Sequence, residues 1–281
     1  MLIHLVADYG LGDLAFAEVA QRLATRIPGA AVVGVPVPAF DTVSAGFCVA
    51  QLALNDGPPA RIVFHNVAPR SDDEDARPDN EGERLSVAQV GEVLVVGPNA
   101  GHVLSFLRDG APTLHEVDVP AGGSQFRSRD LFPDAIADLV AGRDVRGAAI
   151  PLDRVPPPPS EQVVYVDGFG NVKTSWTAAP ADEGTTVAVT IGRTTLPAVV
   201  SDGTFAVPQG TLSFAPGSSG WPTADGGRRR FFELLLRGGS AAERFGGARA
   251  GDRVEIGEAE GRQGQPVGDG TPPPAAGPRA S

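Results

Sequence analysis

A proline-rich segment divides this sequence into two parts with different patterns. Residues 151–161 read PLDRVPPPPSE, and a run of prolines forms a stiff, extended connector because each ring fixes its backbone φ. Such a segment marks a domain boundary. The sequence therefore predicts an N-terminal domain over residues 1–150 and a second domain over residues 162–257. Residues 258–281 are rich in Gly, Pro and Ala, a composition that predicts a disordered tail.

The two parts differ in hydrophobic periodicity. In the first, short apolar runs alternate with segments that repeat apolar residues at helical spacing, which is the pattern of an α/β fold. The predicted strands are residues 1–7, 30–37, 61–68 and 92–101, and the predicted helices are residues 14–27, 43–54 and 131–140. In the second part, short apolar runs alternate with turns. We expect an α/β N-terminal domain with a mixed or parallel sheet, followed by a small C-terminal β-barrel-like domain.

Charge and cysteine content exclude several classes of function. The formal net charge is −11, which excludes a general nucleic-acid surface because phosphate binding needs an excess of Lys and Arg. Cys48 is the only cysteine, so an internal disulfide and a cysteine-based zinc site are excluded. Its apolar helical surroundings predict a packed core thiol. No apolar run reaches the roughly 18 residues of a membrane span, so we expect a soluble, cytoplasmic protein without a membrane partner.

Polar residues follow the predicted strands at the end of a sheet where α/β proteins bind ligands. DYGLGD, residues 8–13, follows the first strand, and its Gly10, Gly12 and Ala15 match a loose dinucleotide-binding pattern. A pyrophosphate at the helix start would be repelled by Asp8 and Asp13. Carboxylates there suit a ribose diol or an ammonium group, and the alternative for Asp13 is a helix cap.

Two other strand-end or loop segments carry groups that suit catalysis. His65 is a candidate base or metal ligand, but no second histidine stands at ligand spacing. SQFRSRD, residues 124–130, places hydroxyls and guanidinium groups before a predicted helix, where they suit an anion or a nucleophile. The alternative there is a structural ion pair between Arg129 and Asp130. The acidic run 72–75 is typical of a solvated loop.

DGFGN, residues 167–171, opens the second predicted domain. Asp and Asn around glycines commonly form a turn, and that explanation is sufficient by itself. Its position just beyond the proline-rich connector also suits a ligand, since ligands often bind between domains.

In chain order, six segments resemble motifs of one enzyme family. They are ADYGLGD, VPAFD, PNAG, SQFRSRD, DGFGN and ELLLRGGSAAERFGGARAGDRVEI, and they span about residues 1–257. The set resembles the S-adenosylmethionine (SAM) hydroxide adenosyltransferases, relatives of fluorinase and chlorinase. The resemblance implies an α/β domain followed by a β-barrel-like domain, assembled as a homotrimer with SAM bound between subunits. SAM is then the substrate, with no cofactor and no metal.

The resemblance also implies roles for individual residues. Asp8 would accept hydrogen bonds from both ribose hydroxyls, while Asp13 and Asp167 would pair with the methionine ammonium group. Phe169 and Asn171 would line the adenine. The other implied substrate-binding residues are Asn99 in the PNAG turn, Ser218 near the methionine carboxylate, and Arg237 and Gly239 at the adenine edge.

The nucleophile machinery departs from the family pattern. Ala68 stands where the family's D-P-G-V-G segment has its aspartate, and Arg127 replaces the histidine of F-H-G-R-D. Ser128 stands where hydrolases have glycine and fluorinase-like members have a serine that contacts halide. Arg77 or Arg70 would supply the family's arginine, and Ser71 lies near a second halide-contacting position. The residues implied in catalysis are Arg127, Ser128 and Arg77.

Three functions stay open at this stage. The first is hydrolysis of SAM to adenosine and L-methionine by attack at the ribose C5′ carbon. The second is attack by halide or another anion at the same carbon. The third is a catalytically silent SAM- or adenosine-binding protein, because the family's catalytic Asp and His are absent.

Overall fold

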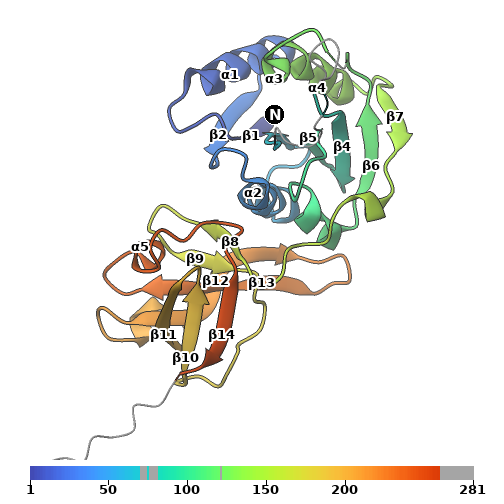
Figure 1. Cartoon of the computed structure of the whole chain (residues 1–281). Helices are drawn as coiled ribbons and strands as arrows, with labels where there is room; N and C mark the ends of the chain where they lie inside the picture. The colour runs from blue at the N-terminus through green and yellow to red at the C-terminus, as the bar shows by residue number, and fades with distance from the viewer. Residues whose placement is uncertain (70–74, 76–81, 121, 260–281) are drawn as a thin grey trace, which may run out of the picture.

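The computed structural model describes residues 1–69, 75, 82–120 and 122–259, and these residues form two seven-stranded sheets. Figure 1 shows the two sheets as separate layers that meet at helix α2. Residues 260–281, which make up most of the predicted tail, and Arg77 lie outside the described residues. No helix in the described part of the chain is long and apolar enough to cross a membrane.

The first sheet is mixed and has the strand order β2-β1-β3-β5-β4-β6-β7. Four strands are parallel and belong to the alternating pattern of the sequence: β1 Leu2–Ala7, β2 Ala31–Pro36, β3 Ile62–Asn66 and β5 Val93–Pro98. Three strands extend it antiparallel and were not predicted: β4 Leu85–Val90, β6 Thr113–Val117 and β7 Arg146–Ala149. The three parallel neighbours β1, β3 and β5 bring their carboxyl ends to one edge.

Helices cover both faces of this sheet because each has an apolar stripe or surface to bury. On one face pack α1 Leu14–Arg26, the short α3 Arg127–Asp130 and α4 Phe132–Val140. On the other face packs α2 Thr42–Leu54 with the 3-10 helix η2 Ser105–Gly110. Cys48 of α2 is buried, and burial raises its thiol pKa to about 12, so the predicted packed core thiol is confirmed.

The second sheet has the order β14-β10-β11-β12-β13-β9-β8 and curls on itself. Its edge strands meet where Gln162 bridges Arg253, beside a hydrogen bond from the Val254 N–H to the Glu161 carbonyl. The strands are β8 Val163–Val166, β9 Val172–Thr174, β10 Thr186–Ile191, β11 Thr194–Val200, β12 Leu212–Pro222, β13 Arg228–Leu236 and β14 Val254–Glu258, with helix α5 Ala241–Arg244 between the last two. An α/β domain followed by a curled β domain is therefore confirmed.

The two domains are packed against each other through α2 and η2. Phe47 of α2 stacks on Tyr165 of the second domain, with ring centroids 5.5 Å apart. Asp109 at the end of η2 accepts a hydrogen bond from the Trp221 indole at 2.8 Å and pairs with Arg229. The Asn55 amide donates to the Gly220 carbonyl at 2.8 Å. This interface fixes the second domain on the α2 side of the first sheet.

Candidate functional site

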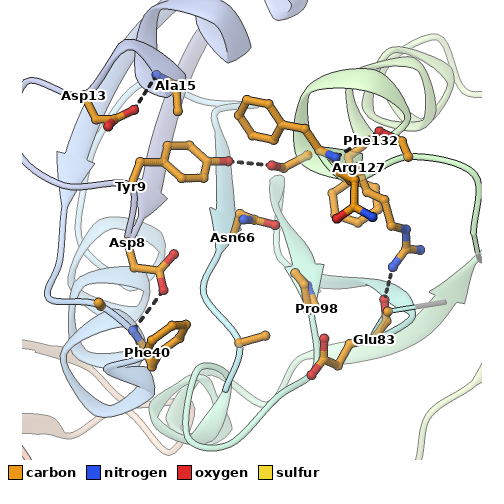
Figure 2. Close-up of a pocket in the computed structure, with 17 residues that line it drawn as sticks. Asp8, Tyr9, Asp13, Ala15, Phe40, Asn66, Glu83, Pro98, Arg127 and Phe132 are labelled. Atoms are coloured by element: carbon orange, nitrogen blue, oxygen red, sulfur yellow. Dashed lines mark hydrogen bonds between the residues drawn. The ribbon is translucent and has the colours of Figure 1, made fainter. Parts of the chain in front are cut away.

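A cavity of about 570 Å³ opens at the carboxyl ends of β1, β3 and β5. Such strand ends are where α/β sheets bind ligands, because loops diverge there and leave space. Figure 2 shows Asp8, Tyr9 and Asn66 around this cavity, with Arg127 and Phe132 on the opposite wall. The lining residues are Asp8, Tyr9, Asp13, Ala15, Ala39, Phe40, Asn66, Ala68, Gly82, Glu83, Pro98, Ser124, Gln125, Phe126, Arg127, Ser128 and Phe132.

Asp8 is half-buried at the end of β1 and has one carboxylate oxygen committed to the protein. Its Oδ2 atom accepts a hydrogen bond from the backbone N–H of Phe40 at 2.9 Å (Figure 2). Among the described residues, no other donor reaches this carboxylate. An ionised carboxylate has about four lone-pair positions, so Asp8 retains acceptor capacity for a ligand in the cavity.

Asp13 caps helix α1 at the same side of the cavity. Its Oδ1 atom accepts a hydrogen bond from the Ala15 N–H at 2.8 Å. The alternative prediction, that Asp13 caps the helix, is therefore confirmed. The preceding turn is closed by the Asp13 N–H donating to the Gly10 carbonyl, and Gly10 has a φ of 97° that suits glycine. The turn thereby places Asp8 and Asp13 at one cavity.

The SQFRSRD segment contributes both a structural ion pair and five residues that line the cavity, Ser124 to Ser128. Asp130 accepts from the Arg129 guanidinium at 2.7 Å and from the Ser124 hydroxyl at 2.6 Å, and these two bonds lower the pKa of its carboxyl. The ion-pair alternative for Arg129 and Asp130 is therefore what the structure contains. Arg127 and Ser128 line the cavity instead.

Arg127 contacts the backbone at Gly82 and Glu83, where the described chain resumes. Its Nη1 donates to the Glu83 carbonyl at 2.8 Å, and its guanidinium lies 5.0 Å from the centre of the Phe132 ring. A Cβ on Gly82 would approach that Nη1 to 2.9 Å. Arg127 therefore supports one wall of the cavity in addition to presenting charge there.

The implied binding residues of the second domain lie outside this cavity. Asp167 closes its own turn, because its carboxylate accepts from the N–H groups of Phe169 and Asn171 and from the Asn171 amide at 2.9 to 3.1 Å. Phe169 is 83% exposed, and Ser218 is exposed as well. Arg237 donates to the Val207 carbonyl at 2.7 Å, two residues before Gly239.

Comparison with known proteins finds a sequence relative and solved structures with a similar fold. No protein-family model matches the chain. A curated protein of Thermus thermophilus, named (R)-S-adenosyl-L-methionine hydrolase, is 28% identical over 203 residues, which are 63% of this chain and 75% of the relative. The chain is therefore similar, at low identity, to a protein that is named as an S-adenosylmethionine hydrolase. The family resemblance of the ordered motifs is thereby confirmed.

Two solved structures share the fold over most of the chain. An uncharacterized conserved protein from Thermotoga maritima superposes with a TM-score of 0.66 at 22% identity and covers 90% of this chain and 99% of its own. A conserved hypothetical protein from Thermus thermophilus gives a TM-score of 0.64 at 26% identity, covering 90% and 98%. Both domains of this chain therefore occur together in other proteins.

The structure separates the residues that the family resemblance implies into three groups. Asp8, Asp13, Arg127 and Ser128 meet at the cavity of the N-terminal domain. Asn99 lines a different cavity of about 590 Å³, together with Arg84, Glu116 and Arg154. The second-domain residues Asp167, Phe169, Asn171, Ser218, Arg237 and Gly239 line neither cavity.

His65, the candidate base or metal ligand, points away from the cavity. It is fully buried on the face of β3 opposite Asn66, and burial lowers its pKa to about 3. A Cβ on Gly97 would overlap its ring, so the imidazole rests directly on the neighbouring strand β5. A neutral imidazole in that position is part of the core.

Sequence reasoning missed several residues that line the cavity. Tyr9 donates a hydrogen bond from its hydroxyl to the Ser128 Oγ at 2.7 Å, and Asn66 lies beside the same hydroxyl (Figure 2). Phe126 and Phe132 supply apolar walls. Tyr9 stands inside the DYG segment and Asn66 ends a predicted strand, so their positions at strand ends were the available signal.

Proposed function

We propose that the chain is a SAM-dependent adenosyltransferase that hydrolyses SAM to adenosine and L-methionine. One observation carries this proposal: Asp8 lies in the cavity at the strand ends, and only one of its two carboxylate oxygens accepts a hydrogen bond from the described part of the protein. A ribose diol presents two hydroxyl donors, which matches the free acceptor capacity of Asp8. The name of the Thermus thermophilus relative, an S-adenosyl-L-methionine hydrolase, supports the substrate and the reaction class.

The reaction is a displacement at the ribose C5′ carbon. A water oxygen forms a bond to C5′ while the C5′–S bond breaks and its electron pair goes to sulfur. The leaving group is the neutral thioether of methionine, and one of the two protons of the attacking water is released to the solvent while the other stays on the new 5′-hydroxyl. The protein contributes by holding the ribose through Asp8 and by placing the water in line with the C–S bond. Ser128, buried at the cavity, is a hydroxyl that can contact this water.

A second candidate reaction uses halide or another anion as the nucleophile. Ser128 supplies a hydroxyl at the cavity where the resemblance implies a halide contact, and Arg127 adds a positive charge nearby. Both reactions share the ribose site and differ only in the group that attacks C5′.

Incubation of the purified protein with SAM tests the proposal. We expect adenosine and L-methionine in equal amounts, measured by chromatography with each sulfonium epimer, since the relative's name specifies the R form. Parallel reactions with chloride and fluoride test the second candidate, which predicts a halogenated adenosine. Calorimetric SAM binding without any product would leave only the silent binding protein, and absence of binding would contradict the site itself.

We further propose that three copies assemble and that the second domain of one copy completes the cavity of the next. All described residues that line the cavity belong to the N-terminal domain, and the implied adenine-side Phe169 is 83% exposed in its own chain. We expect light scattering to give three times the mass of one chain. A monomeric mass together with full SAM affinity would contradict this arrangement.

A further inference from the structure

Tyr9 makes a contact in the cavity that no motif of the resemblance assigns. Its hydroxyl donates to the Ser128 Oγ at 2.7 Å, and the two residues lie 119 positions apart in the chain. Both residues line the cavity, and Asn66 stands beside the Tyr9 hydroxyl (Figure 2). The hydroxyl pair therefore joins the end of β1 to helix α3 across the cavity wall.

The tyrosine ring is fixed independently of its hydroxyl. It makes edge-to-face contacts with Phe16 at 5.2 Å and with Phe126 at 5.7 Å between ring centroids. Such packing restricts the ring to one orientation. Burial raises the pKa of Tyr9 above its ordinary value of 10, so the hydroxyl keeps its proton and acts as a donor at neutral pH.

The direction of this hydrogen bond decides which donor and acceptor positions of the Ser128 hydroxyl remain available to a ligand. A serine hydroxyl has one O–H donor and two acceptor positions. Tyr9 fills one acceptor position, and within the described part of the chain no side chain or carbonyl accepts the Ser128 proton. Ser128 is 3% exposed and lines the cavity. Its O–H is therefore available to a group in the cavity, and donation by Tyr9 polarises it further.

We propose that Tyr9 is a positioning residue that holds the Ser128 hydroxyl as a hydrogen-bond donor to the attacking nucleophile. The inference rests on the proposed displacement at C5′. Tyr9 acts through Ser128, and Ser128 contacts the nucleophile. A nucleophile with a lone pair on oxygen or a halide ion can accept this bond. Loss of either hydroxyl then slows the chemical step, while SAM binding through Asp8 is retained.

A double-mutant cycle in the full-length protein tests this assignment. Tyr9→Phe keeps the ring and its contacts with Phe16 and Phe126 and removes one oxygen. We expect kcat for SAM to fall about tenfold in Tyr9→Phe and about tenfold in Ser128→Ala, with KM within about twofold of wild type. The double variant is expected to lose about tenfold in total, because Tyr9 has no effect once Ser128 is gone.

Tyr165→Phe is the matched control. Tyr165 is the only other tyrosine, its hydroxyl lies beside Cys48, and it does not line the cavity. We expect its kcat to equal that of wild type. Wild-type kcat in Tyr9→Phe would overturn the positioning role, and so would a multiplicative loss of about a hundredfold in the double variant. Either result would leave the proposed function unaffected. A wild-type protein that does not consume SAM overturns the proposed function and this inference together.

Discussion

Replacing Asp8 with alanine is expected to weaken SAM binding by at least about a hundredfold. The free acceptor capacity of this carboxylate faces the cavity, and two ribose hydroxyls would each donate to it. A hydrogen bond to a charged group contributes roughly 1.5–3 kcal/mol, so loss of both weakens binding by roughly 3–6 kcal/mol. That range corresponds to about a hundredfold to ten-thousandfold increase in Kd. Isothermal titration calorimetry with SAM and with adenosine measures it.

Two further variants separate ligand binding from local structure. Asp8→Asn keeps an oxygen that can accept from the Phe40 N–H, so the segment after β2 is held in place while the charge is lost. We expect an intermediate loss of affinity. Asp41→Asn is the matched control, because Asp41 caps α2 through the Ser44 N–H and does not line the cavity. Asparagine caps helices as well as aspartate does, so affinity is expected to be unchanged. Wild-type affinity in Asp8→Ala would contradict the ribose role.

The core of the α/β domain could be predicted because its periodicity is strong. The segments that became β1, α1, β2, α2, β3 and β5 each carry a clear apolar run or helical repeat. Strands β6 and β7 were missed since TLHEV and RGAA are short and polar or small, and most of their residues are not fully buried. Strand β4 was missed because Ser86 and Gln89 interrupt its apolar pattern, although Ser86 is buried and donates to the Gly97 carbonyl.

Part of the candidate site could be predicted, since Asp8, Asp13, Arg127 and Ser128 stand in segments that resemble family motifs and all line the cavity. Asp8 was a candidate because it directly follows the first predicted strand, in a segment that resembles the opening turn of the family. Tyr9 was missed because its partner Ser128 comes near through the fold and not through the sequence. His65 was a candidate because sequence does not tell which face of a strand meets the ligand. In the structure its neighbour Asn66 lines the cavity, and the two side chains point to opposite faces.

The second domain contains a buried ion pair whose disruption is expected to be strongly destabilising. Lys173 of β9 and Glu233 of β13 are cross-strand partners, 6% and 3% exposed, with Nζ and Oε1 2.8 Å apart. Lys173 also lies 3.6 Å from the Asp167 carboxylate in the DGFGN turn. The backbone is close above the pair, because a Cβ on Gly217 would overlap Glu233. The pair therefore joins three segments of the curled sheet.

We expect Glu233→Ala to lower the free energy of unfolding by about 3–5 kcal/mol. Removal of one partner leaves a buried ammonium with only the more distant Asp167, and burial of an uncompensated charge is costly. The double variant Lys173→Met/Glu233→Leu is expected to recover most of that loss, because apolar residues of similar size replace buried ion pairs well. Urea unfolding followed by tryptophan fluorescence measures this, as Trp176 and Trp221 both lie in the second domain.

An exposed ion pair provides the matched control for this change. Arg84 and Glu116 are 3.0 Å apart, with side chains 72% and 36% exposed. Exposed pairs contribute at most about 1 kcal/mol, so Glu116→Ala is expected to lie within that range of wild type. If Glu233→Ala were equally mild, the buried pair would not stabilise the sheet. If the double variant were as unstable as Glu233→Ala, the loss would come from packing under Gly217 and not from the isolated charge of Lys173.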